Sequence, residues 1–484
     1  MGLDVLLVNP PDVTTKYQRF LGITAPPLGL AYIAAVLEEA GYTVRILDCP
    51  PLEMTWEEFR RTVRRLKPKI VSIMATTPII QQAYRAARIV KEELEDVVVC
   101  LGGYHPTFMD AECLEECEHV DIVIRREGEF TLLDLVRALI DGVKSLSEVL
   151  GITYRRKGDI VRNPDRPLIR DLDALPFPAR HLLPMDRYTF FGARTSATTV
   201  ITSRGCPVGC DFCASSRMHG RRLRMHSAER VVSEVAHVRE RYDSDIVAFV
   251  DDTFTYDRRR VERICRLMIE ADLDVTWGCA ARVDTVDREL LELMRDAGCS
   301  VLFFGVESGS QEILDNVGKG FTVRQTKRAF ELCRELGIRT VASAVIGLPG
   351  ETHETARATI RLLKELDPDY AVVSVATPYP GTKFFEEAVE KDLLVDRNWD
   401  KFTLMEPVAA TTELSPEEIK RYQRRAMLEF YLRPRYLLRR LKEDGVDAVR
   451  VAGTMMAEVT FKKLKSLISR LPSPRFSPRQ ETDE

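Results

Sequence analysis

The sequence contains no apolar run of the ~20 residues that a membrane-spanning helix needs. It also has little excess charge: 70 basic residues stand against 74 acidic ones, for a net charge of −4. This balance argues against nucleic-acid binding. The first residues, "MGLDVLLVNPPDV", lack the basic segment and long apolar stretch of a signal peptide. We therefore expect a cytoplasmic protein of two or three domains in 484 residues.

Cysteine is sparse, and most of it is scattered. Eight of the eleven cysteines stand apart, mostly in apolar runs, and are expected as small core residues: 49, 100, 113, 117, 265, 279, 299 and 333. Cys113, Cys117 and His119 could form half of a metal site, but no further ligands stand near them. Only Cys206, Cys210 and Cys213 form a tight group.

The chain alternates strand and helix patterns in two blocks. In the first, strands are expected at 4–11, 42–49, 69–77, 97–106 and 120–129, with helices at 28–41 and 79–94. In the second, strands are expected at 198–203, 245–250, 274–280, 300–306, 339–346 and 370–376. Nearly continuous apolar strands between helices indicate parallel sheets that are covered on both faces.

The predicted fold class is therefore α/β, in four parts. Residues 1–150 should form an open, Rossmann-like parallel sheet, and 151–190, rich in proline, an extended connector. Residues 191–385 should form a partial (β/α)6 barrel and 386–484 a helical C-terminal region. In both sheets the functional loops are expected at the carboxyl ends of the strands.

The three clustered cysteines lie in "CPVGCDFC", directly after the first strand of the barrel. Three thiolates can hold three irons of a [4Fe-4S] cluster and leave the fourth iron open to a ligand. A structural zinc site normally has four protein ligands, and His219 is the nearest candidate for the fourth. The spacing favours the open cluster, with zinc as the alternative.

This motif, with Phe212 before the third cysteine and six βα units behind it, resembles the radical S-adenosylmethionine enzymes. The resemblance implies that S-adenosylmethionine binds the open iron and is cleaved to a 5′-deoxyadenosyl radical. It also implies a flavodoxin or ferredoxin-type electron donor. Contacts to S-adenosylmethionine are expected from charged residues at the ends of barrel strands: Asp251, Asp252, Arg282 and Glu307. The alternative for each is a structural ion pair or a helix cap.

The order of the domains is similar to that of the cobalamin-binding subfamily. The resemblance rests on "NPP", "SIMATT", "GGYHP" and "REGE" at the strand ends of the first block. It implies cobalamin contacts from Asn9, Pro10, Ser72, Thr76, Thr77, Gly102, Gly103, His105, Glu127, Gly128 and Glu129. The cobalt-ligating D-x-H-x-x-G motif is absent, and His105 is expected to make a loop hydrogen bond instead. A domain that kept the fold and lost the cofactor is the alternative.

The implied function is methylation of an unactivated carbon of a lipid or other large substrate. A radical cyclase acting on a lipid or tetrapyrrole is the alternative, and a non-catalytic cobalamin sensor is a weaker one. Residues 433–470 hold ten basic and four acidic residues, and "FKKLKSLISRL" has apolar residues at helical spacing. This segment could lie on an anionic membrane surface, or it could pack on an acidic barrel.

Overall fold

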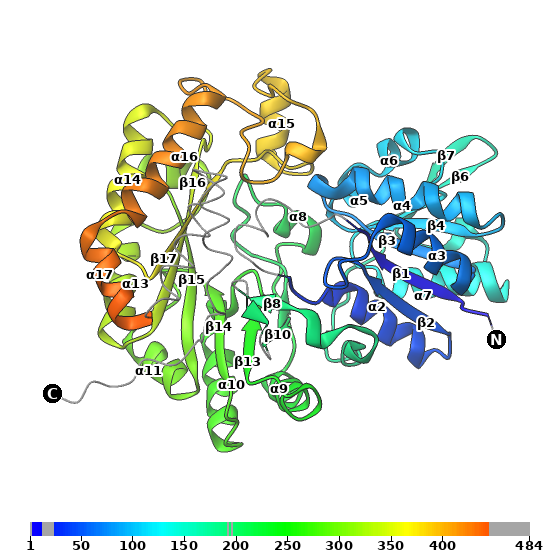
Figure 1. Cartoon of the computed structure of the whole chain (residues 1–484), viewed down its shortest axis with the longest axis horizontal. Helices are drawn as coiled ribbons and strands as arrows, with labels where there is room; N and C mark the ends of the chain where they lie inside the picture. The colour runs from blue at the N-terminus through cyan, green and yellow to red at the C-terminus, as the bar shows by residue number, and fades with distance from the viewer. Residues whose placement is uncertain (1, 12–23, 191–192, 195–196, 445–484) are drawn as a thin grey trace.

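The computed structural model describes residues 2–11, 24–190, 193–194 and 197–444. It contains two sheets, one in the N-terminal domain and one in the barrel, which lie side by side (Figure 1). This arrangement confirms the predicted α/β class.

The N-terminal sheet has seven strands in the order β2-β1-β3-β4-β5-β6-β7. The first five are parallel: β1 (Val5–Asn9), β2 (Val44–Asp48), β3 (Ile70–Met74), β4 (Val98–Gly102) and β5 (Ile122–Ile124). Alternate residues of β1 enter two separate cores, one on each face of the sheet. Helices α2 (Leu28–Glu39) and α7 (Glu129–Val136) contribute to one core. Helices α3 (Trp56–Leu66), α4 (Ile80–Glu93) and α6 (Asp110–Glu116) contribute to the other.

This sheet continues beyond residue 150, where we predicted a connector. Strands β6 (Ile152–Arg156) and β7 (Asp159–Arg162) form a hairpin that pairs antiparallel with β5. Lys157 and Gly158 form its turn, both with positive φ. Irregular chain then runs from residue 163 to β8 (Thr189–Phe190), with short 3-10 turns only. The strand expected at 97–106 ends at Gly102, and α5 (Tyr104–Phe108) follows it.

The barrel sheet holds six parallel strands in sequence order. They are β10 (Ala197–Val200), β13 (Ile246–Phe249), β14 (Thr276–Ala281), β15 (Cys299–Glu307), β16 (Arg339–Ile346) and β17 (Tyr370–Val375). The helices that follow them in turn include α9 (Ala228–Tyr242), α10 (Arg258–Glu270), α11 (Arg288–Asp296), α13 (Val323–Glu335) and α14 (His353–Leu366). Strands β10 and β17 form the two edges of this sheet and do not pair with each other in the described chain. The sheet is therefore an open, partial barrel, as predicted.

The C-terminal region is helical as far as the structure describes it. It includes α15 (Lys383–Glu390), α16 (Pro416–Tyr431) and α17 (Pro434–Asp444). Helix α16 packs on the edge strand β17, where the Tyr431 hydroxyl donates to the Ala371 carbonyl at 2.8 Å. None of the described helices is long and apolar enough to cross a bilayer.

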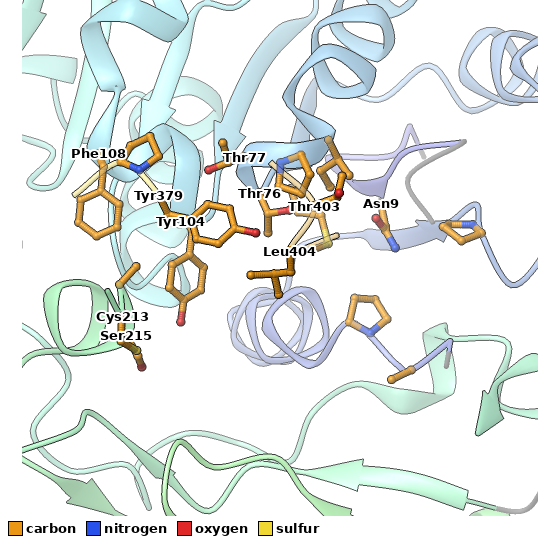
Figure 2. Close-up of a pocket in the computed structure, with 18 of the residues that line it drawn as sticks. Asn9, Thr76, Thr77, Tyr104, Phe108, Cys213, Ser215, Tyr379, Thr403 and Leu404 are labelled. Atoms are coloured by element: carbon orange, nitrogen blue, oxygen red, sulfur yellow. The ribbon is translucent and has the colours of Figure 1, made fainter. Parts of the chain in front are cut away.

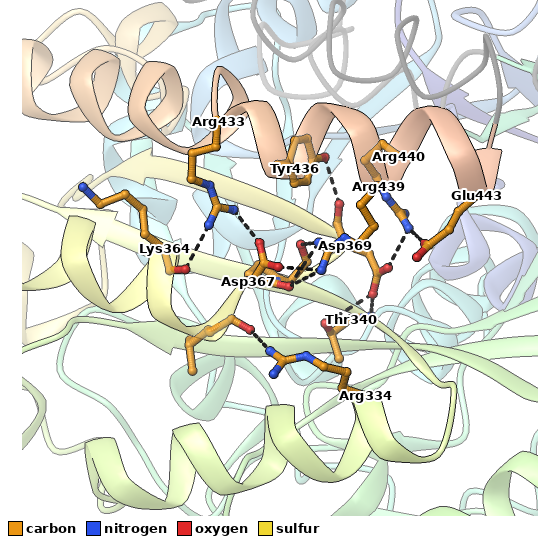
Figure 3. A network of polar contacts seen from close by, with 12 residues as sticks. Arg334, Thr340, Lys364, Asp367, Asp369, Arg433, Tyr436, Arg439, Arg440 and Glu443 are labelled. Atoms are coloured by element: carbon orange, nitrogen blue, oxygen red, sulfur yellow. Dashed lines mark hydrogen bonds and ion pairs between the residues drawn. The ribbon is translucent and has the colours of Figure 1, made fainter.

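Helix α17 is held by barrel carboxylates (Figure 3). Arg433 and Arg439 pair with Asp367 at 2.7 and 2.6 Å, and Arg440 pairs with Asp369 at 3.1 Å. This first part of the basic segment therefore packs on the barrel, and contact of residues 433–470 with an anionic membrane stays a prediction. The amphipathic stretch at 461–471 lies outside the described residues.

The eight scattered cysteines are all buried, as predicted for core residues. Throughout the described ranges, no three His, Cys, Asp or Glu side chains are gathered around a common point for a single metal ion. Cys113 and Cys117 therefore belong to the hydrophobic core between the sheet and its helices.

Candidate active site between the two sheets

A cavity of about 520 Å³ separates the carboxyl ends of the N-terminal strands from the cysteine loop (Figure 2). Its N-terminal wall includes Asn9, Thr24, Ala25, Pro27, Asp48, Pro50, Met74, Thr76, Thr77, Pro78, Ile79, Tyr104 and Phe108. Its opposite wall consists of Cys213, Ala214, Ser215, Tyr379, Pro380, Thr403 and Leu404. The loop ends of both sheets thus face one volume, and a ligand held there would contact both domains.

The cysteine loop connects the two strands of a short antiparallel ribbon, β11 (Ser203–Arg204) and β12 (Arg224–Met225). The Cys206 amide donates to the Gly220 carbonyl at 3.2 Å, which closes the loop at its base. Gly205 is required there: its φ is +96°, and a side-chain carbon would lie 2.6 Å from the Arg222 carbonyl oxygen. Backbone contacts therefore set the start of the loop.

The thiols of the loop suit an iron–sulfur cluster better than zinc. All three cysteines are half-buried. Burial raises the pKa of the Cys213 thiol to about 12, and a bound metal would favour its thiolate form. His219, the candidate fourth zinc ligand, packs edge-on against the Tyr104 ring at 6.0 Å between centroids. In a cubane each cysteine would bind a different iron, which needs no common point for all three sulfurs.

Arg282 and Glu307, two of the predicted S-adenosylmethionine contacts, lie beside the loop at adjacent strand ends. Glu307 accepts from the Lys319 ammonium at 2.6 Å, and Arg282 donates to Asp284 and to the Lys319 carbonyl, both at 2.8 Å. Burial raises the pKa of the Cys210 thiol, and Lys319, Glu307 and Arg282 are near enough to influence it. This charged group fits the polar end of an amino-acid ligand, and the contact itself stays a prediction.

Lys319 was not predicted from the sequence as a site residue. Burial opposes its charge, but Glu307 and Cys210 outweigh that effect and raise its pKa, so it is an ammonium. The available signal was the sequence "VGKG" just after the short helix α12 (Gln311–Asn316), which places a lysine between two glycines of positive φ. Glu307 also has a left-handed backbone, with φ +59°, a strained state often found at functional sites.

The two aspartates after β13 have different environments. Asp251 is buried and accepts from the Thr202 amide at 2.6 Å, from the Ser203 hydroxyl at 2.7 Å and from the Thr202 hydroxyl. These hydrogen bonds give Asp251 a structural role, and its contact with a ligand stays a prediction. Asp252 is exposed and accepts from Ser215, which lines the cavity, so its role toward a ligand stays a prediction.

Of the predicted cobalamin contacts, Asn9, Thr76 and Thr77 line the cavity, whereas the others are not among its lining residues. Ser72 is buried within β3, and Gly103, with φ +116°, lets the chain pass closely over Ala75. Pro10, Gly102 and Gly128 are likewise absent from the described lining.

His105 makes the expected hydrogen bond within the protein. Its Nδ1 lies 3.2 Å from the Thr77 hydroxyl, and its ring packs against Trp399 at 4.9 Å between centroids. Burial lowers the pKa of His105 to about 4, which keeps the ring neutral. The residue supports the cavity-lining Thr77 from behind.

The prediction that Glu127 and Glu129 contact cobalamin is corrected, because both carboxylates point to the barrel. Glu129 pairs with Arg204 at 2.6 Å and Glu127 pairs with Arg224 at 2.8 Å, all with side chains at most 8% exposed. The stretch "REGE" contains both glutamates and "TSRG" contains Arg204, but nothing in the sequence pairs them.

Several cavity residues had no sequence prediction. The buried Asp48 accepts from Asn9 at 2.7 Å and from the Tyr188 hydroxyl at 2.6 Å, and burial raises its pKa to about 6. The hydroxyl of Thr403 is buried without a partner among the described residues. The next residue, Leu404, has φ +63°. A carboxyl group in one wall and an orphaned hydroxyl in the opposite wall fit a ligand rich in amide groups, as cobalamin is.

Comparison with known proteins finds a matching family for each of the two domains that line this cavity. Residues 21–136 match the B12 binding domain, and residues 200–363 match the radical SAM superfamily. An uncharacterized methyltransferase of Pyrococcus horikoshii is 39% identical over 441 residues, which is 91% of this chain and 95% of the relative. The chain belongs to the cobalamin-dependent radical SAM family. It is therefore an enzyme whose cofactors are a [4Fe-4S] cluster, S-adenosylmethionine and cobalamin.

Two further matches show how wide this family is. The anaerobic magnesium-protoporphyrin IX monomethyl ester cyclase of Rubrivivax gelatinosus is 33% identical over 389 residues, covering 79% of this chain and 69% of the relative. The structure of the radical SAM methyltransferase TsrM from Kitasatospora setae, with cobalamin and a [4Fe-4S] cluster bound, aligns with a TM-score of 0.73. It covers 97% of this chain and 99% of that one at 17% identity, and so shows a shared fold.

Proposed function

We propose that this enzyme methylates an unactivated carbon of a lipid or other large substrate. The cluster and S-adenosylmethionine would supply the radical that removes a hydrogen atom, and cobalamin would supply the methyl group. The observation that supports this is the shared cavity, in which Cys213 and Ser215 of the cluster loop face Thr76 and Thr77 of the cobalamin domain. Radical generation and methyl delivery would then meet at one substrate carbon.

The residues of this chain would hold the cluster, orient S-adenosylmethionine and exclude water from the cavity. Cys206, Cys210 and Cys213 would hold the cluster. Lys319 and Arg282, paired with Glu307 and Asp284, would orient the polar end of S-adenosylmethionine beside it. Tyr104 and Phe108 put aromatic surface into the cavity and reduce its contact with water.

The test uses reconstituted enzyme with S-adenosylmethionine that has a deuterated methyl group, incubated anaerobically with lipid extracts. A product heavier by one deuterated methyl group, formed together with 5′-deoxyadenosine, would support methyl transfer. The cyclase named among the relatives supports a second candidate, radical ring formation. In that case a product would form with 5′-deoxyadenosine but without deuterium.

We also propose that the electron comes from a flavodoxin or ferredoxin-type protein that docks beside the loop. Arg217, Arg221 and Arg222 are exposed, and no ion pair within the described chain neutralises them. Arg221 donates to the carbonyl of Val208, between the first two cysteines, at 3.2 Å. Acidic electron carriers would be steered to such a patch. Gln at these three positions should slow reduction by flavodoxin, more so at low salt, and leave reduction by a small cationic reductant unchanged.

A further inference from the structure

Two buried arginines tie the base of the cluster loop to the cobalamin domain. Arg204 of β11 lies 2.6 Å from Glu129 and 3.3 Å from Glu127, and Arg224 of β12 lies 2.8 Å from Glu127. Arg204 also lies over the ring of Tyr32 in α2, at 5.4 Å. The carboxylates belong to one domain and the guanidinium groups to the other, so this contact crosses the domain boundary.

The ribbon that holds these arginines needs partners from outside. Arg204 and Arg224 are directly opposite in the β11–β12 pairing. Like charges in this relation destabilise an antiparallel pair, and a buried guanidinium without a counter-charge costs several kcal/mol. Glu127 and Glu129 provide the counter-charges. The conformation of the ribbon therefore depends on the N-terminal domain.

The same ribbon frames the cluster loop. Arg204 is followed directly by Gly205 and Cys206, and the Cys206 amide donates to the Gly220 carbonyl. Arg224 donates at 2.9 Å to the carbonyl of His219, the last residue of α8 (Ser215–His219), which follows the three cysteines. A shift of either arginine would move one end of the loop, and the cysteines with it.

The carboxylates come from the sheet edge that lines the cobalamin cavity. Glu129 begins α7 and Glu127 stands three residues after β5, at the carboxyl end of that strand. Further along the same sheet, β1 ends at Asn9, and Thr76 and Thr77 follow the end of β3 at Met74; all three line the cavity. The carboxyl ends of one sheet thus present residues to the cofactor and counter-charges to the cluster loop.

We infer that Glu127 and Glu129 are positioning residues, which set where the cluster stands relative to cobalamin. Neither contacts the cavity, and they act through Arg204 and Arg224. Without them, two buried arginines lose their counter-charges, and the loop relaxes toward solvent. The inference rests on the two cofactors being bound, and does not depend on which substrate is methylated.

The experiment measures the distance between the reduced cluster and cob(II)alamin by pulsed electron paramagnetic resonance in the reconstituted enzyme. Glu129→Gln and Glu127→Gln should broaden or shift this distance, and should speed loss of iron to a chelator about tenfold. Asp134→Asn is the matched control: it removes an ion pair with Arg166 that lies wholly outside the ribbon. The control should leave the distance and the iron loss unchanged.

Melting curves separate positioning from general stability. Glu129→Gln keeps Glu127 as a partner for both arginines, so this variant should stay folded even if Glu127→Gln does not. A folded Glu129→Gln enzyme with the wild-type distance distribution and wild-type iron loss would overturn the inference. None of these measurements involves the methylated product, so a wrong substrate or a wrong reaction in the proposed function would not affect them.

Discussion

The Asp251 carboxylate accepts a hydrogen bond from the Thr202 amide at 2.6 Å, which joins the end of β13 to the start of the cluster ribbon. It also accepts from the hydroxyls of Thr202 and Ser203. A residue that the sequence suggests as a ligand contact thus fastens the segment that leads to Cys206.

Replacing Asp251 by Ala should therefore destabilise the protein. Three donors would lose a buried charged acceptor, at a cost of about 2–4 kcal/mol in the free energy of unfolding. Asp186→Ala is the control, because Asp186 is 80% exposed and its ion pair with Arg187 is solvent-accessible, so its loss should cost within ~0.5 kcal/mol. Denaturant unfolding of both variants measures the difference, and equal values would contradict this role.

Replacing Cys206, Cys210 and Cys213 by Ala should remove the cluster. Wild-type protein should bind about four irons per chain after anaerobic reconstitution, with visible charge-transfer absorbance, and the triple variant should have neither. Cys333→Ala, in the barrel core, should keep the iron despite some loss of stability. Stoichiometric zinc in place of iron would reject the cluster.

His105 should not ligate cobalt, because its Nδ1 faces Thr77 and its ring faces Trp399. The cob(II)alamin spectrum should lack nitrogen superhyperfine splitting from the protein. If such splitting were present and disappeared in His105→Ala, this reading would be wrong.

The depressed pKa of His105 also predicts a pH dependence of stability. Because its pKa falls to about 4 in the folded protein from an ordinary 6.5, the unfolded chain binds the proton more tightly. The contribution is present above pH ~6.5 and is lost as pH falls toward ~4, with a total of about 3 kcal/mol. Unfolding curves across this window should be flatter for His105→Phe than for wild type. Equal slopes would contradict the assignment.

Thr403→Val should weaken cobalamin binding, because it removes a buried hydroxyl that has no partner in the described protein. One lost hydrogen bond predicts roughly a threefold to tenfold rise in the dissociation constant. The cofactor-free variant should be at least as stable as wild type, since an unsatisfied group is gone. Absorbance titration and melting curves measure the two effects. Unchanged affinity would show that the hydroxyl does not face the cofactor.

Attraction of the tail to anionic membranes should not depend on Arg433, Arg439 or Arg440, because these residues are paired with barrel carboxylates. Each basic residue near such a surface contributes about 1 kcal/mol, screened over ~8 Å at physiological salt. Gln at 462, 463 and 465 should reduce binding to anionic vesicles at low salt and leave uncoupled S-adenosylmethionine cleavage intact. No vesicle binding by the wild-type protein would favour a non-lipid substrate.

The sequence by itself determined the two α/β blocks and the cysteine loop. Strand positions were predicted within a few residues, because continuous apolar runs such as "YAVVSVA" have no other stable place than a covered parallel sheet. The spacing of Cys206, Cys210 and Cys213 is local, so the sequence could also predict the cluster. The hairpin of β6 and β7 was missed, although "RRKGDI" has the form of a hairpin turn, because prolines further on suggested one long connector.

Only the tertiary structure decided which charged residues are enclosed by partners and which are exposed. Asp251 and Asp252 are neighbours with the same side chain, yet one is enclosed by donors and the other is exposed. Glu127 and Arg204 are 77 residues apart and meet only when the domains dock. Thr403 and Leu404 reach the cavity because the chain returns across the end of β17, where the Val375 amide donates to the Leu404 carbonyl at 2.8 Å. Hydrophobic periodicity is a property of neighbouring residues, whereas the pairing of buried charges depends on contacts between distant ones, which a single sequence does not contain.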